Sequence, residues 1–119
     1  GEAPSDETEL VVARARWLLE RMGASPDSLG CRYAALTAGE LARDRDQSML
    51  LKVAYCPAMR AGKTSQANVE KNIRVLIARL HAMASAGYTA MMGGMPGRRP
   101  DNRTFLHRLA EAARGGTEE

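Results

Sequence analysis

The sequence predicts an all-α domain, a compact bundle of about five to six helices that contains a helix-turn-helix. Only 4% of its 119 residues are aromatic, whereas Ala, Leu, Met and Arg are abundant. This composition favours helices packed through small residues over β-sheets. Apolar residues also recur at helical spacing, and glycines and prolines separate the segments. A chain of this length encloses one core, so one domain is expected.

Two helices are predicted in the first third of the chain. The first covers Asp6–Met22, and Gly23 can end it in the left-handed conformation. Its expected buried stripe is Leu10, Trp17, Leu18 and Met22, with Trp17 in the core. The second helix is predicted over Leu29–Asp44, with an apolar face of Tyr33, Leu36 and Leu41.

Two further helices are expected around a break at Gly62. The apolar segment Gln47–Tyr55 leads into a short helix, Pro57–Ala61, whose proline suits a first helical turn. The longest and clearest helix follows. It is predicted to begin with Thr64 or Ser65 as its cap and to run to Ala84.

The end of the chain is predicted to be a broken loop followed by a last helix. Residues 85–101 hold four glycines and two prolines, which leaves room for a single helical turn around Thr89–Met92. Asp101 or Asn102 is expected to cap the last helix, with the stripe Phe105, Leu106, Leu109 and Ala113. Residues 1–8 are predicted to be a linker, 9–114 the domain and 115–119 a disordered tail.

Positive charge is concentrated in the second half of the chain. Residues 60–108 hold nine Lys and Arg against two acids, a formal charge of +7, whereas residues 1–59 and 109–119 each carry −2. Such a distribution is typical of a nucleic-acid-binding face, and a solvated basic surface is the alternative.

The predicted helix Thr64–Ala84 has two contrasting faces. At 100° per residue, one face comprises Val69, Ile73, Leu76, Ile77, Leu80 and Met83. The opposite face comprises Thr64, Ala67, Asn68, Lys71, Val75 and Ala78, with Asn72 and Arg74 on its shoulders. Amide and basic side chains beside small residues are what a helix in the DNA major groove needs. A solvated face, with Glu70 and Arg74 as a surface ion pair, is the alternative.

The helix and the basic loop together supply the candidate DNA-binding residues. Because Pro100 restricts Arg99 to an extended backbone, Arg98 and Arg99 are expected to project from the loop toward phosphates or a minor groove. The candidate residues are Thr64, Ser65, Ala67, Asn68, Glu70, Lys71, Arg74, Arg98 and Arg99.

Enzyme chemistry has little support in the sequence. Gly62-Lys63-Thr64 resembles the end of a phosphate-binding loop, but Pro57 stands where that loop needs a glycine. Nucleophilic catalysis would require Cys31 or Cys56 beside His81 or His107. Their spacing resembles no metal site. No enzyme activity, cofactor or metal is therefore predicted.

The expected setting is cytoplasmic. No stretch approaches 18 apolar residues and no secretion signal begins the chain, so no membrane partner is predicted. A helical protein–protein interaction module without DNA binding remains the alternative function. Its contacts would be the adaptable side chains of Met91, Met92 and Met95.

Short motifs spread over residues 11–114 carry a family resemblance. They are, in order, Met22-Gly23, Gly30, Tyr33, Lys52–Tyr55, Thr64-Ser65, Val69–Lys71, Ile73-Arg74, Gly87–Thr89 and Pro100-x-Asn102-x-x-Phe105. In this order and spacing the chain resembles the C-terminal DNA-binding effector domain of the master sporulation response regulator, the phosphorylation-activated transcription factor of endospore-forming bacteria.

The resemblance implies a six-helix domain that inserts the helix Thr64–Ala84 into the major groove of double-stranded promoter DNA. It implies transcription regulation in a two-component system, dimerisation on tandem sites, contact with RNA polymerase and an upstream receiver domain. Two departures are visible. Asn68 and Lys71 stand where the family has arginines, and the segment between Ile77 and Gly87 is about seven residues shorter. The second departure falls where the family touches RNA polymerase.

Overall fold

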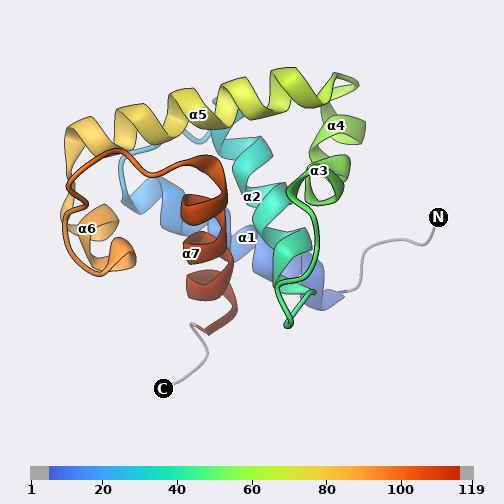
Figure 1. The fold of residues 1–119 in the computed structure, drawn as a ribbon, viewed down its shortest axis with the longest axis horizontal. Coiled ribbons are helices and arrows are strands. Elements are labelled where there is room, and N and C mark those ends of the chain that lie inside the picture. Colours follow the sequence, from blue (N-terminus) through green and yellow to red (C-terminus); the bar gives the residue numbers. More distant parts are fainter. Residues whose placement is uncertain (1–5, 116–119) are drawn as a thin grey trace.

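The computed structural model describes residues 6–115, and this part of the chain is helical without any strand (Figure 1). The all-α prediction is confirmed. The helices are α1 (Asp6–Arg21), α2 (Leu29–Ala42), α3 (Leu51–Ala54), α4 (Cys56–Gly62), α5 (Gln66–Met83), α6 (Ala86–Met92) and α7 (Asn102–Gly115). The predicted linker overlaps α1, which begins at Asp6, while residues 1–5 and 116–119 lie outside the described range.

Helix α2 forms the centre of the domain and packs against α1, α5 and α7. Two of its glycines allow these helices to approach closely. A Cβ added to Gly39 would lie 2.4 Å from Cγ2 of Val12 in α1, and one added to Gly30 would lie 2.7 Å from the carbonyl oxygen of Asn72 in α5. The backbones of α2 and α5 therefore pack almost directly on each other.

The predicted apolar stripes of α5 and α7 are largely confirmed. Buried residues of α5 are Val69, Ile73, Leu76, Ile77 and Leu80, and those of α7 include Phe105, Leu106, Leu109 and Ala113. Met83, predicted to complete the α5 stripe, is 54% exposed. It lies at the last turn of α5 and reaches only the edge of the core, beside Gly23.

The predicted stripe of α1 was wrong for Leu10 and Trp17, whereas Met22 is buried and Leu18 is half-buried against the core, as predicted. Leu10 and Trp17 are 50% and 55% exposed, whereas Val11, Ala15 and Leu19 are buried. The close approach of α1 to α2, where a Cβ on Gly39 would lie 2.4 Å from Cγ2 of Val12, decides which face turns inward. Trp17 lies outside the core, with the Arg21 guanidinium 4.9 Å from its ring centre.

Three helix boundaries agree with the expected capping chemistry. Gly23, after α1, has a φ of +113°. The Ser65 hydroxyl accepts a hydrogen bond from Asn68 N at 3.1 Å and caps α5. A carboxylate oxygen of Asp101 accepts from Thr104 N at 2.8 Å at the start of α7. The backbone and side-chain hydrogen bonds from Thr104 lower the pKa of Asp101.

The predicted break at Gly62 is displaced by one residue. Gly62 is the last residue of α4, and Lys63 adopts the left-handed conformation with a φ of +50°. A Cβ on Gly62 would lie 2.3 Å from the Tyr33 hydroxyl oxygen, so the glycine is required by close packing. Two other boundaries also differ, because α2 ends at Ala42 rather than Asp44 and the predicted single turn at 89–92 is the longer helix α6.

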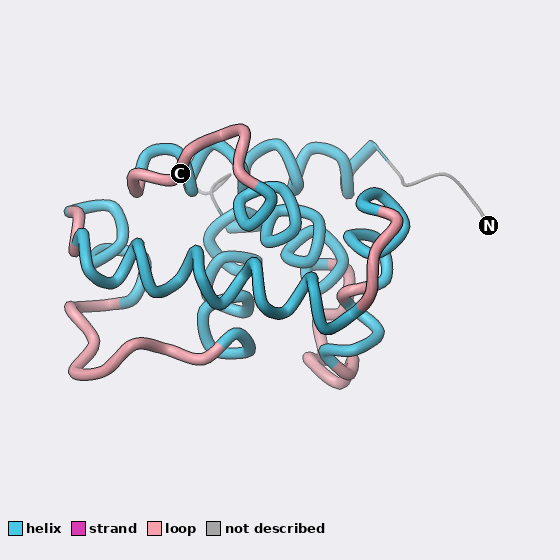
Figure 2. Tube along the Cα trace, turned by 90° about the horizontal axis from the view of Figure 1, so that it is seen from above, coloured by secondary structure: helices cyan, strands magenta, loops and turns pink. Residues whose placement is uncertain are grey.

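The connections bring distant parts of the chain to one side of α5. Helix α5 lies along one edge of the domain, with α4 at its N-terminal end and α6 at its C-terminal end (Figure 1). The loop of residues 93–101 then returns beside α5 to the start of α7 (Figure 2). Within residues 6–115, no helix is both long and apolar enough to cross a membrane.

Candidate nucleic-acid interface

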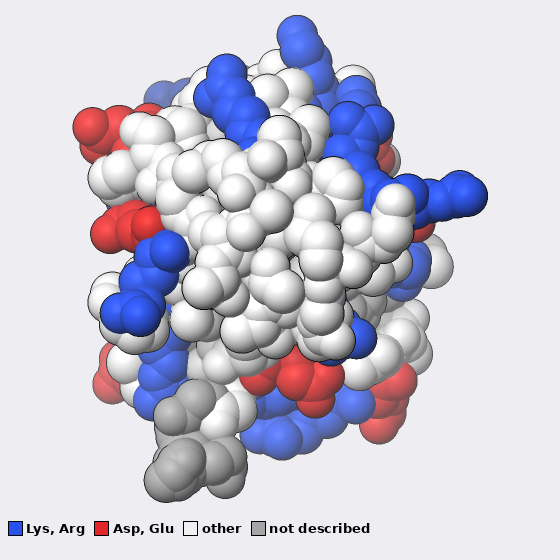
Figure 3. All heavy atoms as spheres, turned by 90° about the vertical axis from the view of Figure 1, so that its left-hand side faces the viewer, with Lys and Arg blue, Asp and Glu red and all other residues white. Residues whose placement is uncertain are grey.

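The N-terminal half of α5 presents most of the predicted DNA-binding residues at the surface. Ser65, Ala67, Lys71 and Arg74 are exposed, whereas Thr64, Asn68 and Glu70 are half-buried. The exposed side chains lie away from the buried stripe, as the helical periodicity predicted. In Figure 3, several Lys and Arg side chains lie along the upper edge of the molecule, the edge that α5 occupies in Figure 1.

Polar side chains at the start of α5 and within its first turns also form hydrogen bonds that stabilise the helix itself. The Asn72 amide donates to the Asn68 backbone oxygen at 2.8 Å and to its side-chain oxygen at 3.3 Å. The Ser65 hydroxyl is engaged in the cap of the helix. The first turns of α5 are thereby held rigid, and Lys71 and Arg74 are the basic side chains that project from this support.

Glu70 does not pair with Arg74 within the described part of the chain. Its carboxylate accepts instead from the Gln66 amide at 3.0 Å, one helical turn away. The ion pair considered from the sequence is therefore not formed among residues 6–115, where Arg43 and Glu40 make the one salt bridge, at 3.4 Å.

A surface hollow of about 460 Å³ lies between the α3–α4 junction, α5 and the start of α7. We call it the arginine hollow. Its lining residues are Leu51, Tyr55, Glu70, Arg74, Arg99, Pro100, Asp101, Asn102 and Arg103. It brings the predicted residues Arg74 and Arg99 together, although they are far apart in the sequence. Arg98 is exposed but does not line it.

Arg103 is a residue of this hollow that was not among the sequence candidates. It lies in the first turn of α7, where a positive side chain is unfavourable because the helix dipole places positive charge there. Such a position is a sequence feature that could have drawn attention to it. Because an arginine at this position does not favour helix stability, Arg103 is a candidate for another role.

Asn102 connects three elements beneath the hollow. Its side-chain nitrogen donates to the Tyr55 hydroxyl at 3.1 Å and to the Glu70 backbone oxygen at 3.2 Å. Tyr55 is 1% exposed, and its burial raises the pKa of the phenol, so the hydroxyl stays neutral. Asn102 therefore fixes the start of α7 against α5 and the α3–α4 junction.

Replacing Asn102 with alanine is expected to lower the free energy of unfolding by about 1–3 kcal/mol, because it removes the hydrogen-bond partner of a buried hydroxyl. Urea unfolding of Asn102→Ala, Tyr55→Phe and the double variant measures this. If the contact is formed, the double variant loses less stability than the two single losses added together. The contact would be contradicted if the two single losses of stability simply added in the double variant. An unchanged urea midpoint for Asn102→Ala would also contradict it.

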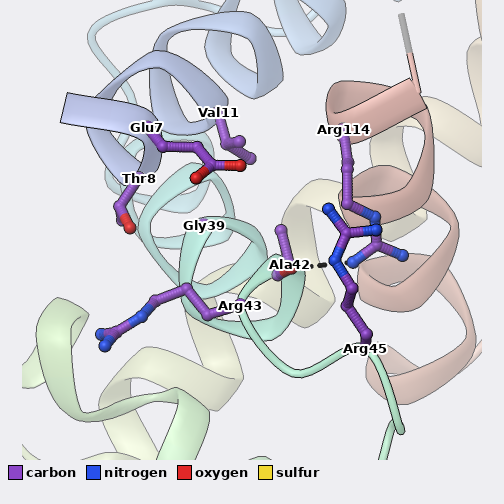
Figure 4. A pocket seen from close by; sticks show the side chains of 8 residues that line it. All are labelled: Glu7, Thr8, Val11, Gly39, Ala42, Arg43, Arg45 and Arg114. Atoms are coloured by element: carbon purple, nitrogen blue, oxygen red, sulfur yellow. Dashed lines mark hydrogen bonds between the residues drawn. The ribbon is translucent and has the colours of Figure 1, made fainter. Parts of the chain in front are cut away.

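A second hollow, of about 270 Å³, lies between α1, the end of α2 and α7 (Figure 4). Its arginines have a structural explanation. Arg114 donates to the backbone oxygen of Ala42 at 2.8 Å, and Ala42 is the last residue of α2. A cation at this position satisfies a free carbonyl at the negative end of the helix and ties α7 to α2.

Three of the four residues considered for catalysis are buried or make other contacts. Cys31 is buried, and burial raises the pKa of its thiol, which disfavours the reactive thiolate. The Cys56 thiol faces the Lys52 backbone oxygen at 3.8 Å, and His81 Nδ1 lies 2.9 Å from the Tyr88 hydroxyl. Among residues 6–115, no group of three or more His, Cys, Asp and Glu is placed to hold a metal ion.

Comparison with known proteins identified no similar protein. No family model, no curated protein and no solved structure matches the chain. The candidate interface is thus defined by the chain's own geometry: the exposed N-terminal half of α5 and the arginine hollow beside it.

Proposed function

We propose that this domain is a sequence-specific double-stranded DNA-binding transcription regulator and that α5 is its recognition helix. The observation that supports this most directly is the exposure of Ala67, Lys71 and Arg74 on the first turns of a helix whose opposite face is fully buried. A helix held in this way can enter the major groove without disturbing the core.

The elements before α5 favour a helix-turn-helix arrangement. The short helix α4 is followed by Lys63, Thr64 and Ser65, a turn of three residues that includes one in the left-handed conformation. A turn of this length joins the two helices of DNA-binding helix-turn-helix units. In the proposal α4 crosses the phosphates, where the exposed side chains of Arg60 and Lys63 add positive charge.

Three residues on the first turns of α5 have an assigned role in this proposal. Lys71 reaches the acceptor edge of guanine, because its ammonium donates without accepting. Ala67 is small enough to let the helix backbone approach the bases. Asn68 contributes through whichever amide hydrogens are not used within the helix, since its oxygen already accepts from Asn72.

The family resemblance extends the proposal to the effector domain of a cytoplasmic, response-regulator-type protein with a receiver domain upstream. Contact with RNA polymerase is less favoured. The resemblance would place it between Ile77 and Gly87, and here only Ala84 and Ser85 separate α5 from α6. The short connection favours a regulator that occupies its site without that contact.

Selection of bound sequences from random duplex DNA at two salt concentrations tests the proposed function. We expect a recurring short site, with affinity that falls steeply as salt rises because each contacted phosphate releases counterions. Selection without any enriched sequence, together with flat salt dependence, would reject DNA binding.

Glu70→Ala tests sequence discrimination. In the proposal the carboxylate accepts from a cytosine amino group and repels bases that present only acceptors. Its removal is expected to raise affinity for non-target duplexes and to reduce discrimination at one or two positions, with little change at the best site. Titration of single-base variants of the selected site measures this. If Glu70→Ala changes the affinity for all single-base variants of the site equally, Glu70 does not discriminate between bases and has only its hydrogen bond to Gln66.

A second candidate function, a protein–protein interaction module, is favoured by one surface. The face in Figure 3 is largely uncharged at its centre, and it is the side of the molecule at which α6 lies. Met83 and Met95 are 54% and 46% exposed, while Met91 and Met92 are half-buried. Exposed methionines adapt to varied apolar partners. In this alternative, Met83→Ser would weaken partner binding, whereas Lys71→Ala would not.

A further inference from the structure

Three arginines from three separate elements line one hollow. Arg74 comes from α5, Arg99 from the loop before α7, and Arg103 from the first turn of α7. Arg74, Arg99 and Arg103 are all exposed. Like charges brought together at a surface repel one another unless an anion lies between them.

The two acids in the hollow offset its three arginines only in part, although Arg103 lies close enough to Asp101 to help lower the pKa of that carboxyl. The Glu70 carboxylate accepts from Gln66 at 3.0 Å, and the Asp101 carboxylate accepts from Thr104 N at 2.8 Å. Within the described range, neither acid forms a salt bridge with an arginine. The guanidinium groups therefore keep their hydrogen-bond donors for a ligand, and the hollow retains a net positive charge.

We propose that the arginine hollow is the seat of a backbone phosphodiester of the bound DNA, and that Arg103 is a phosphate contact. The inference rests on the proposed function, because it takes α5 as the helix in the groove. It assigns Arg74 to a phosphate contact shared with Arg99 and Arg103.

The chemistry of the hollow fits a phosphodiester. A guanidinium offers parallel N–H donors that match two phosphate oxygens, and several can share one phosphate. The hollow of about 460 Å³ lies at the surface, where a strand could pass over it. Arg74 links it to the outer face of α5, so a strand bordering the groove that α5 enters would lie across it.

The hydrogen bonds of Asn102 would allow the phosphate contact of Arg103 to position α5 on the DNA. They hold the start of α7, and with it Arg103, against α5 at the level of Glu70. A phosphate bound by Arg103 would therefore set the depth and direction of α5 in the groove. Contacts of this kind carry no sequence information themselves but fix the register in which bases are read.

The first test measures the salt dependence of DNA binding for Arg103→Ala against the wild type. Arg108→Ala is the matched control, because Arg108 is an exposed arginine of the same helix outside the hollow. Loss of one phosphate contact lowers the slope of log affinity against log salt by about one unit. Between 50 and 200 mM salt, the affinity of Arg103→Ala should then fall about three- to fourfold less than that of the wild type. Arg103→Lys should restore part of the slope.

The second test locates the phosphate. Duplexes that carry a neutral methylphosphonate at one position each are titrated with wild type and Arg103→Ala. We expect one position at which neutralisation weakens the wild type but leaves Arg103→Ala unchanged, while Arg108→Ala behaves as wild type. Thermal unfolding and circular dichroism confirm that each variant is folded.

Three outcomes would overturn the inference. If the wild type binds DNA steeply but Arg103→Ala keeps its full slope, the proposed function stands and the hollow is not a phosphate seat. If inorganic phosphate binds in an Arg103-dependent way while the DNA slope is unchanged, the hollow serves a free anion. If the wild type binds no duplex at any salt concentration, the proposed function fails and this inference fails with it.

Discussion

Replacing Phe105 with alanine is expected to lower the free energy of unfolding by about 3–5 kcal/mol. Phe105 is 0% exposed and lies parallel to the ring of Tyr88, with ring centres 6.5 Å apart. Its removal leaves a cavity where α6 meets α7, and the hydrogen bond between Tyr88 and His81 limits how far the surroundings can collapse into it.

Denaturant unfolding of Phe105→Ala measures the loss, with Glu111→Ala as the control. Glu111 is exposed on the same helix, so its replacement should change stability by no more than about 0.5 kcal/mol. A loss of less than about 1 kcal/mol for Phe105→Ala would mean that α7 does not pack as described. Small domains have about 5–15 kcal/mol of stability, so the expected loss is a large share of it.

Replacing Lys71 and Arg74 together with alanine is expected to weaken binding to the selected DNA site by about 2–6 kcal/mol, the sum of two contacts of about 1–3 kcal/mol each. Both side chains are exposed, so the unfolding free energy should barely change. Fluorescence anisotropy with a labelled duplex measures the affinity.

The single variants separate the two roles, and Arg79→Ala, an exposed arginine further along α5, serves as the control. Lys71→Ala should relax the preference for one base, since it removes a contact to a base edge. Arg74→Ala should weaken all sequences alike and reduce the salt dependence. Wild-type affinity in both single variants would reject α5 as the recognition helix.

Local chemistry allowed α5 and α7 to be predicted well from the sequence. Both have a single apolar stripe with polar residues elsewhere, and each starts with a side-chain cap, Ser65 and Asp101 respectively. The register of α1 was harder, because apolar residues surround much of that helix. Which of them is buried depends on the close packing of α1 on α2 at Gly39, a tertiary property that periodicity does not contain.

The candidate site could be predicted only in part, for a similar reason. The exposed face of α5 follows from helical geometry alone. The arginine hollow combines residues near positions 51–55, 70–74 and 99–103, and nothing local links them. Arg103 was missed because it was considered only as part of an amphipathic helix, although its place in a first turn was unusual.

The separation of the two faces of α5 also has an evolutionary consequence. The core depends on side chains such as Ile73 and Leu80, whereas the outer positions 67 and 71 are exposed. The bond that anchors the middle of the helix ends on the backbone oxygen of residue 70 and not on its side chain. Substitutions at these outer positions can accumulate without loss of folding, so under the proposed function descendants of this gene would be free to diverge in the sites they recognise while the same scaffold persists.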